Sequence, residues 1–162
     1  MLEYIKRLFG FKHIKPYQAE VCPWIWRGSK VNQEQLKDLK KRGFRLIISL
    51  CSKNQKNAKI CEKVELKYLQ FTVCDNQLEP EEVNAFISIM KAIEKTKVYC
   101  PIYIYCEDGR EKTGIMIACY RVKAMGWKVE DAIKEAKEYG LKDQKQIDFI
   151  KWHSDQRYRY IL

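Results

Sequence analysis

The residues best suited to chemistry lie in one stretch of the sequence. Residues 102–120 read I-Y-I-Y-C-E-D-G-R-E-K-T-G-I-M-I-A-C-Y, which predicts a short strand, a polar loop and a helix. A loop that enters a helix N-terminus has free backbone N–H groups and the positive end of the helix dipole, and together these bind anions. Cys106 opens this loop, where such a field favours the thiolate form of a cysteine. The stretch therefore predicts a cysteine placed to attack a bound phosphate.

The same stretch resembles the phosphate-binding loop of the cysteine-dependent protein tyrosine and dual-specificity phosphatases. That family's signature is His-Cys, five residues, Arg, and then Ser or Thr; here Cys106 is followed by residues 107–111, Lys112 and Thr113. The sequences W-I-W-R-G-S, L-I-I-S-L and E-D-A-I-K-E-A are similar to small atypical or bacterial members. The resemblance implies a phosphatase without metal or other cofactor, which hydrolyses phosphomonoesters of proteins or small molecules through a cysteinyl-phosphate intermediate.

The resemblance also assigns roles to individual residues. It implies that Cys106 is the nucleophile and that the Thr113 hydroxyl stabilises the thiolate when it leaves in the second step. Asp75, in V-C-D-N-Q-L-E-P, matches the mobile loop whose acid protonates the leaving oxygen, and it is preferred over the nearby glutamates because it directly follows a predicted strand. The residues expected to bind phosphate are Glu107, Asp108, Gly109, Arg110, Glu111 and Lys112.

Three positions depart from the family's signature. Tyr105 stands where the family has histidine, Glu111 where aspartate is common, and Lys112 where the family has arginine. A guanidinium holds two phosphoryl oxygens at once, whereas an ammonium is a point charge, so the change at Lys112 is expected to reduce the rate by roughly 10²–10³. Phosphate binding is expected to survive this change better than catalysis. The chain is therefore either an impaired enzyme or a pseudophosphatase that binds phosphorylated ligands.

The sequence also suggests where the other charged side chains of the loop lie. Arg110 either adds positive charge at the mouth of the site or forms a surface ion pair with Glu111 or Asp108. The side chains of Glu107 and Asp108 are expected to point away from the phosphate, because the backbone of such a loop faces inward.

Outside the loop, four residues have two interpretations each. Arg27 and Ser29, in R-G-S, either line one wall of the cleft or belong to an ordinary turn. Cys51 and Cys74 either trap Cys106 as a reversible disulfide or are buried core residues, and the core interpretation is preferred for both.

The charge balance favours anionic partners. The chain has 31 Lys and Arg against 21 Asp and Glu, a formal net charge of +10, which concentrates phosphoesters, nucleic acids or acidic membranes near the surface without choosing among them. Inositol phosphate or phosphoinositide hydrolysis and RNA 5′-triphosphatase activity stay open as alternatives. Nucleic-acid binding is not expected, because there is no RNA-recognition motif. Membrane contact has no support beyond the basic surface. A monomer is expected.

The length and the order of predicted elements indicate one α/β domain. Its 162 residues suit a single domain, 1–162, with about residues 1–15 as an amino-terminal extension or helix. Predicted strands at 24–26, 44–50, 68–73 and 102–105 alternate with helical patterns. This alternation favours a central, mostly parallel sheet flanked by helices, with strand 102–105 at its centre and a phosphate-binding loop after it.

The cysteines bear on the compartment. There are seven, an odd number, without a C-x-x-C pair and with only two histidines, so a disulfide scaffold and a metal site are both disfavoured. A cytoplasmic protein is predicted. The thiols are expected to be reduced, the sequence has no long uncharged apolar run, and charged residues interrupt its first dozen positions.

Overall fold

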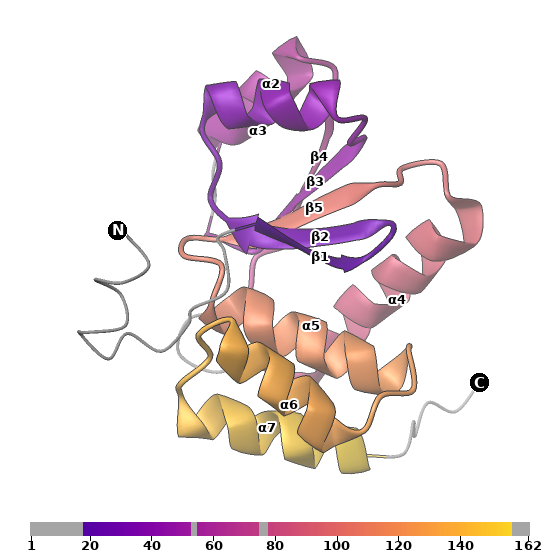
Figure 1. Ribbon diagram of the computed structural model, residues 1–162, viewed down its shortest axis with the longest axis vertical. Coiled ribbons are helices and arrows are strands. Elements are labelled where there is room, and N and C mark those ends of the chain that lie inside the picture. The colour runs from indigo at the N-terminus through magenta and orange to yellow at the C-terminus, as the bar shows by residue number, and fades with distance from the viewer. Residues whose placement is uncertain (1–17, 53–54, 75–77, 157–162) are drawn as a thin grey trace, which may run out of the picture.

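The computed structural model describes residues 18–52, 55–74 and 78–156 (Figure 1). Five strands form one sheet in the order β1-β2-β5-β3-β4. β1 pairs with β2 antiparallel, and the other pairs are parallel, so the predicted mostly parallel sheet is confirmed. The helix expected over about residues 1–15 lies outside the described residues. The strands are β1 (Gln18–Cys22), β2 (Ile25–Ser29), β3 (Leu46–Ser49), β4 (Lys67–Gln70) and β5 (Ile102–Cys106).

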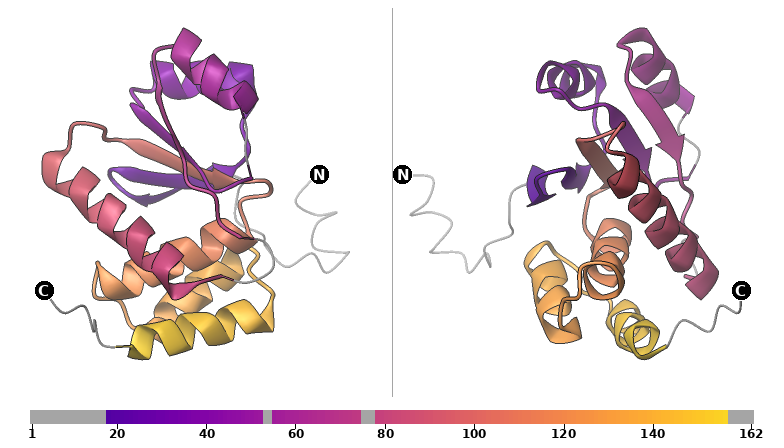
Figure 2. Two further views of the ribbon diagram at one scale, coloured as in Figure 1. Left: turned by 180° about the vertical axis from the view of Figure 1, so that it is seen from behind. Right: turned by 90° about the vertical axis from the view of Figure 1, so that its right-hand side faces the viewer.

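Helices cover both faces of this sheet. Figure 1 shows α2 and α3 on one side and α4 to α7 on the other, and Figure 2 shows the same layers from two further sides. The helices are α2 (Gln33–Lys41), α3 (Gln55–Lys63), α4 (Pro80–Thr96), α5 (Glu111–Lys123), α6 (Val129–Glu138) and α7 (Gln144–Asp155).

Local signals in the sequence set the ends of several helices. The Asn32 side chain caps α2 by accepting a hydrogen bond from the Gln35 backbone N–H at 2.9 Å. Pro80 opens α4, where its missing N–H costs nothing. Gly43 follows α2 with a φ of +88°, a left-handed conformation that favours glycine.

Strand β2 is longer than the sequence indicated. Of the two interpretations of Arg27-Gly28-Ser29, the ordinary turn is wrong, because these residues continue β2 and pair with Ile104, Tyr105 and Cys106 of β5. β1, which the sequence did not indicate, pairs with the other edge of β2. The partner residues on β5 lie far along the chain, so a local pattern did not reveal this extension.

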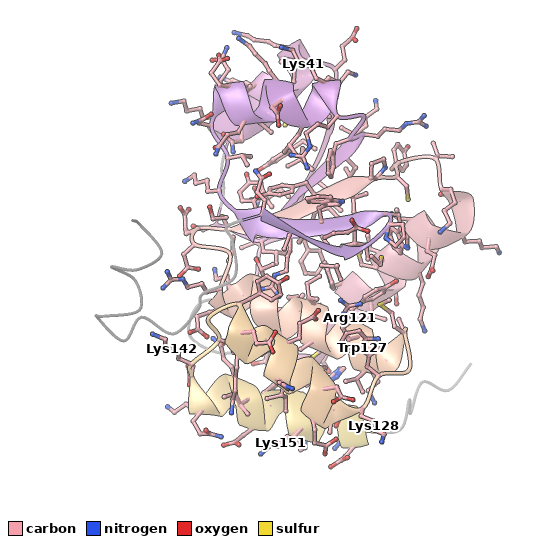
Figure 3. All side chains as sticks on the ribbon, viewed as in Figure 1. Lys41, Arg121, Trp127, Lys128, Lys142 and Lys151 are labelled. Carbon is pink, nitrogen blue, oxygen red and sulfur yellow. The ribbon has the colours of Figure 1, made fainter. Side chains whose placement is uncertain are left out.

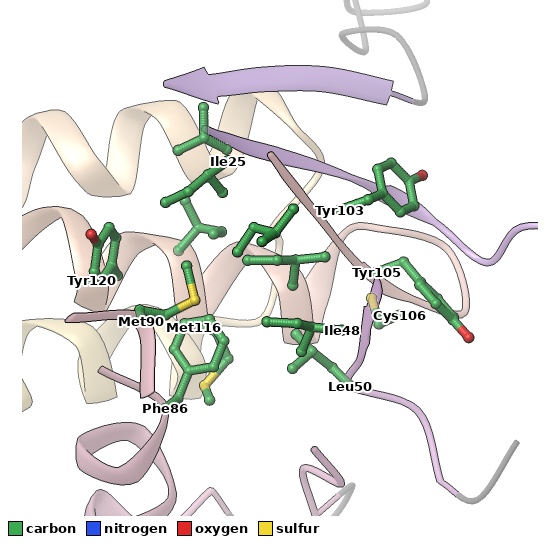
Figure 4. Close-up of a cluster of buried hydrophobic side chains, with 14 of the residues drawn as sticks. Ile25, Ile48, Leu50, Phe86, Met90, Tyr103, Tyr105, Cys106, Met116 and Tyr120 are labelled. Carbon is green, nitrogen blue, oxygen red and sulfur yellow. The ribbon is translucent and has the colours of Figure 1, made fainter. Parts of the chain in front are cut away.

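β5 lies at the centre of the sheet, as predicted, and is buried along its whole length. Tyr103 and Tyr105 share one face of β5, and Figure 4 shows them on the opposite side from Met116 of α5. Residues 113–121 of α5 are all buried. The core therefore fixes both the strand before the phosphate-binding loop and the helix after it.

Candidate active site

Cys106 ends the central strand, and α5 begins five residues later, so the structure has the predicted order of strand, loop and helix. Cys106 is 3% exposed. Thr113 lies in the first turn of α5 and is fully buried, and its hydroxyl has no hydrogen-bond partner among the described residues. That hydroxyl is therefore available to a thiolate or a bound anion.

Gly109 fixes the shape of the loop by packing on β2. Its φ is +72°, and a Cβ atom at this position would lie 2.6 Å from the backbone carbonyl carbon and oxygen of Gly28. Contacts this short do not occur between real atoms, so only glycine fits here. The loop is thus seated directly on the sheet.

Asp108 faces the nucleophile. Its Oδ1 lies 3.8 Å from the Cys106 thiol, which donates to it, and accepts the backbone N–H of Arg110 at 2.9 Å. The prediction that the Asp108 side chain points away is therefore wrong. The physical reason is local, since an aspartate readily bonds the N–H two residues ahead. Its carboxylate takes one of the amide hydrogen bonds that a phosphoryl oxygen would use.

Glu107 does point away from the nucleophile, as expected. Its carboxylate accepts two hydrogen bonds from the Lys30 ammonium, at 3.0 and 3.2 Å. This bond raises the pKa of Lys30. Both side chains are exposed, so the pair contributes little to stability.

Lys112 connects the loop to the segment that precedes Asp75. Its ammonium donates to the Val73 carbonyl at 2.9 Å. Asp75 itself lies outside the described residues. The neighbouring Glu111 accepts the backbone N–H of Lys142 at 3.2 Å, which holds the turn before α7 against α5.

A pocket of about 440 Å³ opens beside these two side chains. Its lining combines apolar side chains with polar side chains that carry both signs of charge. The lining residues are Val73, Cys74, Leu78, Glu111, Lys112, Ile115, Asp143, Lys145, Gln146 and Phe149. The pocket therefore lies against the first turn of α5, next to the loop that follows Cys106.

The structure also places Tyr105 and Arg110. Tyr105, in the place of the family's histidine, directs its hydroxyl to Asn57, whose amide donates to it at 3.0 Å, so the residue is satisfied away from the nucleophile. The Arg110 side chain lies along Gly140, since a Cβ there would be 3.0 Å from Arg110 Cδ. Arg110 forms no ion pair with Glu111 or Asp108 among the described contacts.

Arg27 is the residue that sequence reasoning undervalued. It is buried, and its Nη2 donates to the Gly109 carbonyl at 3.0 Å. Strand alternation would have indicated its burial only if the strand had been extended past Trp26, because Arg27 then shares a face with the fully buried Ile25 two residues earlier. The paired Ser29 is also buried, opposite Cys106.

The two cysteines considered as redox partners lie in different surroundings. Cys51 is buried, as preferred, and burial raises the pKa of its thiol to about 11. Cys74 is exposed, so its interpretation as a core residue is wrong. Over the ranges that the structure describes, no cluster of His, Cys, Asp and Glu is suited to holding a metal ion.

Comparisons with known proteins agree with this geometry. A model of the tyrosine phosphatase family matches residues 14–158. The inositol diphosphatase DSP3 of Arabidopsis thaliana is 28% identical over 132 residues, covering 78% of this chain and 64% of that protein. The dual specificity protein phosphatase TpbA of Pseudomonas aeruginosa is 20% identical over 124 residues, covering 76% of this chain and 55% of that protein. The chain thus spans less than two thirds of either relative.

A solved structure shows the same fold. The catalytic domain of the PP-IP phosphatase SIW14 from S. cerevisiae superposes with a TM-score of 0.66 at 22% identity, covering 84% of each chain. The predicted α/β phosphatase fold is therefore confirmed. None of the helices in the described parts of the chain has the length and apolar character needed to cross a membrane.

Proposed function

Because the chain belongs to the tyrosine phosphatase family, we propose that it hydrolyses phosphomonoesters through a phosphoryl group carried on Cys106. The observation that carries this proposal is the position of Cys106, which ends the central strand at a glycine-seated loop leading into α5. Free amides of such a loop bind phosphoryl oxygens and stabilise their charge in the transition state. One family model spans residues 14–158, which supports a single catalytic domain. The proposal also keeps the expectation of a monomer.

The reaction has two steps. In the first, the Cys106 thiolate attacks phosphorus, a P–S bond forms, the P–O bond to the leaving group breaks, and Asp75 gives that oxygen its proton. In the second, water attacks phosphorus and gives its proton to the Asp75 carboxylate, while the P–S bond breaks. The Thr113 hydroxyl stabilises the departing thiolate. The contact of Lys112 with Val73, two residues before Asp75, supports the choice of this acid.

A slow enzyme or a phospho-ligand binding module is the second candidate, and two observations favour it. Lys112 is a point charge already engaged with the Val73 carbonyl, so it holds phosphate less well than a guanidinium fork. The Asp108 carboxylate, beside Cys106, already accepts the hydrogen bond of the Arg110 backbone N–H, one of the amides of the loop. Both features weaken stabilisation of the transition state, and both leave a phosphate-sized anion able to bind.

For the substrate, we propose a singly phosphorylated side chain of a protein, phosphotyrosine in particular. In the pocket lining, the carboxylates of Glu111 and Asp143 offset the ammonium groups of Lys112 and Lys145, and Asp108 adds a further carboxylate at the loop, so the site has little excess positive charge for a ligand that bears many phosphates. The apolar side chains of Ile115 and Phe149 in the lining suit an aromatic ring. Inositol polyphosphates fit this charge pattern less well, although one of the similar proteins is named an inositol diphosphatase.

Steady-state turnover tests the reaction. The chain is expected to hydrolyse an aryl phosphate in the presence of a chelator, and Cys106→Ser is expected to abolish this activity. Cys100→Ser is the matched control, because Cys100 lies just before the other end of β5 and is expected to leave the rate unchanged. Activity that persists in Cys106→Ser would sink the mechanism.

Substrate preference is tested separately. The ratio kcat/KM is expected to be higher for a phosphotyrosyl peptide than for an inositol pyrophosphate. The opposite order, measured at one salt concentration, would contradict the proposed substrate while leaving the mechanism intact.

A further inference from the structure

Arg27 carries a buried charge directly behind the phosphate-binding loop. It is 2% exposed, and its guanidinium lies 4.3 Å from the centre of the Tyr139 ring at the end of α6. In the register of β2 with β5 it pairs with Ile104, two residues before Cys106. Its Nη2 reaches the Gly109 carbonyl at 3.0 Å. One side chain therefore joins the sheet, the loop and α6.

The bond to Gly109 sets the direction of the next amide. In a trans peptide, the carbonyl of one residue and the N–H of the following residue point to opposite sides. Because Arg27 holds the Gly109 carbonyl toward the interior, the Arg110 N–H points the other way. There it meets Asp108 Oδ1, the same oxygen that lies 3.8 Å from the Cys106 thiol. Arg27 thus turns an anion-binding amide toward the nucleophile.

The charge of Arg27 is only partly compensated by its surroundings. Glu135 is the nearby carboxylate, but it is already bonded to Arg121 at 2.7 and 3.1 Å. Burial lowers the pKa of Arg27 to about 10, so the guanidinium is still charged at neutral pH. Its Nη1 is buried without a hydrogen-bond acceptor among the described residues. An unsatisfied buried donor opposes folding, and such groups gather at functional sites.

We propose that Arg27 is a positioning residue of the phosphate-binding loop, which turns the Arg110 amide toward a bound phosphoryl group and adds a buried positive charge behind it. This inference rests on the proposed function of the loop as a phosphoryl site. It also offers a physical reason why the loop binds anions although its rim has an ammonium at Lys112 and a carboxylate at Asp108.

The test measures tungstate binding by calorimetry together with turnover and Tm. Arg27→Met removes the hydrogen bond and the charge, and is expected to weaken tungstate binding roughly 10²-fold and to lower kcat more than it raises KM. Arg27→Gln keeps a neutral donor for the Gly109 carbonyl and is expected to lose less. Arg27→Lys keeps the charge and much of the volume, so this variant is expected to fold. Its tungstate affinity is expected to lie between that of the native protein and that of Arg27→Met.

Arg121→Gln is the matched control. Arg121 is also buried, at 5% exposed, and lies 3.9 Å from the centre of the Trp127 ring (Figure 3), but it pairs with Glu135 and donates to the Val21 carbonyl rather than to the loop. Its replacement is expected to lower Tm at least as much as Arg27→Lys while leaving tungstate affinity unchanged. A purely structural role for Arg27 predicts that both arginine positions lower Tm and that neither changes tungstate affinity.

The outcomes separate this inference from the phosphatase proposal. Folded Arg27→Lys or Arg27→Met protein that binds tungstate as tightly as the native protein overturns the positioning role, whatever its turnover. Tungstate binding that depends on Arg27, in a protein without any turnover, supports the positioning role and overturns the enzyme.

Discussion

The two sides of the phosphate-binding loop are held in different ways. On the β2 side, Gly109 is pressed onto Gly28 and its carbonyl is fixed by the buried Arg27. On the α7 side, the half-buried Glu111 and Lys112 bond backbone groups of neighbouring segments, beside an open pocket. The β2 side is continuous with the core, whereas two of the departures from the family's signature lie on the α7 side. Packing on the core thus fixes the shape of the loop, whereas the side chains that could change its chemistry, Glu111 and Lys112, lie on its α7 side.

The largest expected effect comes from disturbing the β2 side. Gly109→Ala places a Cβ 2.6 Å from the Gly28 backbone, so it is expected to lower turnover by at least roughly 10³-fold and to destabilise the fold by about 1–3 kcal/mol beyond the cost of the left-handed backbone. Steady-state kinetics measure the turnover, and urea unfolding measures the free energy of unfolding.

Gly126→Ala is the control for that variant. Gly126 has the same φ of +72° but open space around it, so alanine is expected to cost only about 1 kcal/mol of stability and no activity. Equal behaviour of the two variants would mean that the β2 side is not tightly packed.

On the α7 side, Lys112→Arg is expected to improve the protein. A guanidinium restores bidentate contact with the phosphoryl group, so kcat is expected to rise by roughly 10²-fold with a smaller change in KM. Lys145→Arg, in the same pocket but outside the loop, is expected to leave kcat unchanged. If the native protein turns over as fast as Lys112→Arg, the interpretation of Lys112 as an impaired position fails.

A smaller gain is expected from Asp108→Asn. This change removes a negative charge beside Cys106 but keeps an oxygen for the Arg110 N–H, so tungstate affinity is expected to increase by roughly fivefold, about 1 kcal/mol. Glu107→Gln is the comparison, since its carboxylate is paired with Lys30 away from the site. An equal or larger gain in Glu107→Gln would indicate a general charge effect.

The smallest effect concerns how α7 is anchored. Burial and the Lys123 charge lower the pKa of His153 to about 4, from an ordinary value near 6.5. Between these values the unfolded chain binds more protons than the folded one, so His153 makes stability fall as the pH drops from 6.5 toward 4. Hydrogen exchange at pH 5 is expected to increase in α7 before it increases in β2.

His153→Gln is expected to reduce this pH dependence, because a glutamine amide replaces the ring near Asn84, which lies 3.1 Å from His153 Nε2, and does not titrate. An unchanged pH dependence in this variant would remove His153 as its source.

Features written in local sequence were predicted correctly. The apolar run before Cys106, the polar loop and the helical pattern after it gave the central strand and its loop, since each depends on neighbours a few residues away. The helix cap at Asn32 and the glycine after α2 follow from the same short-range physics.

Features that depend on distant partners were not predicted. Arg27 is a strand residue because β5 pairs with it, some 80 residues later, and R-G-S alone is typical of a turn. The direction of Asp108 and the Val73 partner of Lys112 depend on how the loop is seated on the folded domain. Side-chain directions at a loop are a property of the tertiary structure, and the sequence pattern carries little information about them.

Phosphoryl transfer through Cys106 is tested most directly by rapid acid quenching of turnover on an aryl phosphate, followed by mass spectrometry of the peptide that contains Cys106. We expect a phosphoryl group on Cys106, more of it in Asp75→Asn because the second step slows, and none in Cys106→Ser. Turnover without phosphoryl transfer to Cys106, or with the phosphoryl group on another residue, would contradict this mechanism.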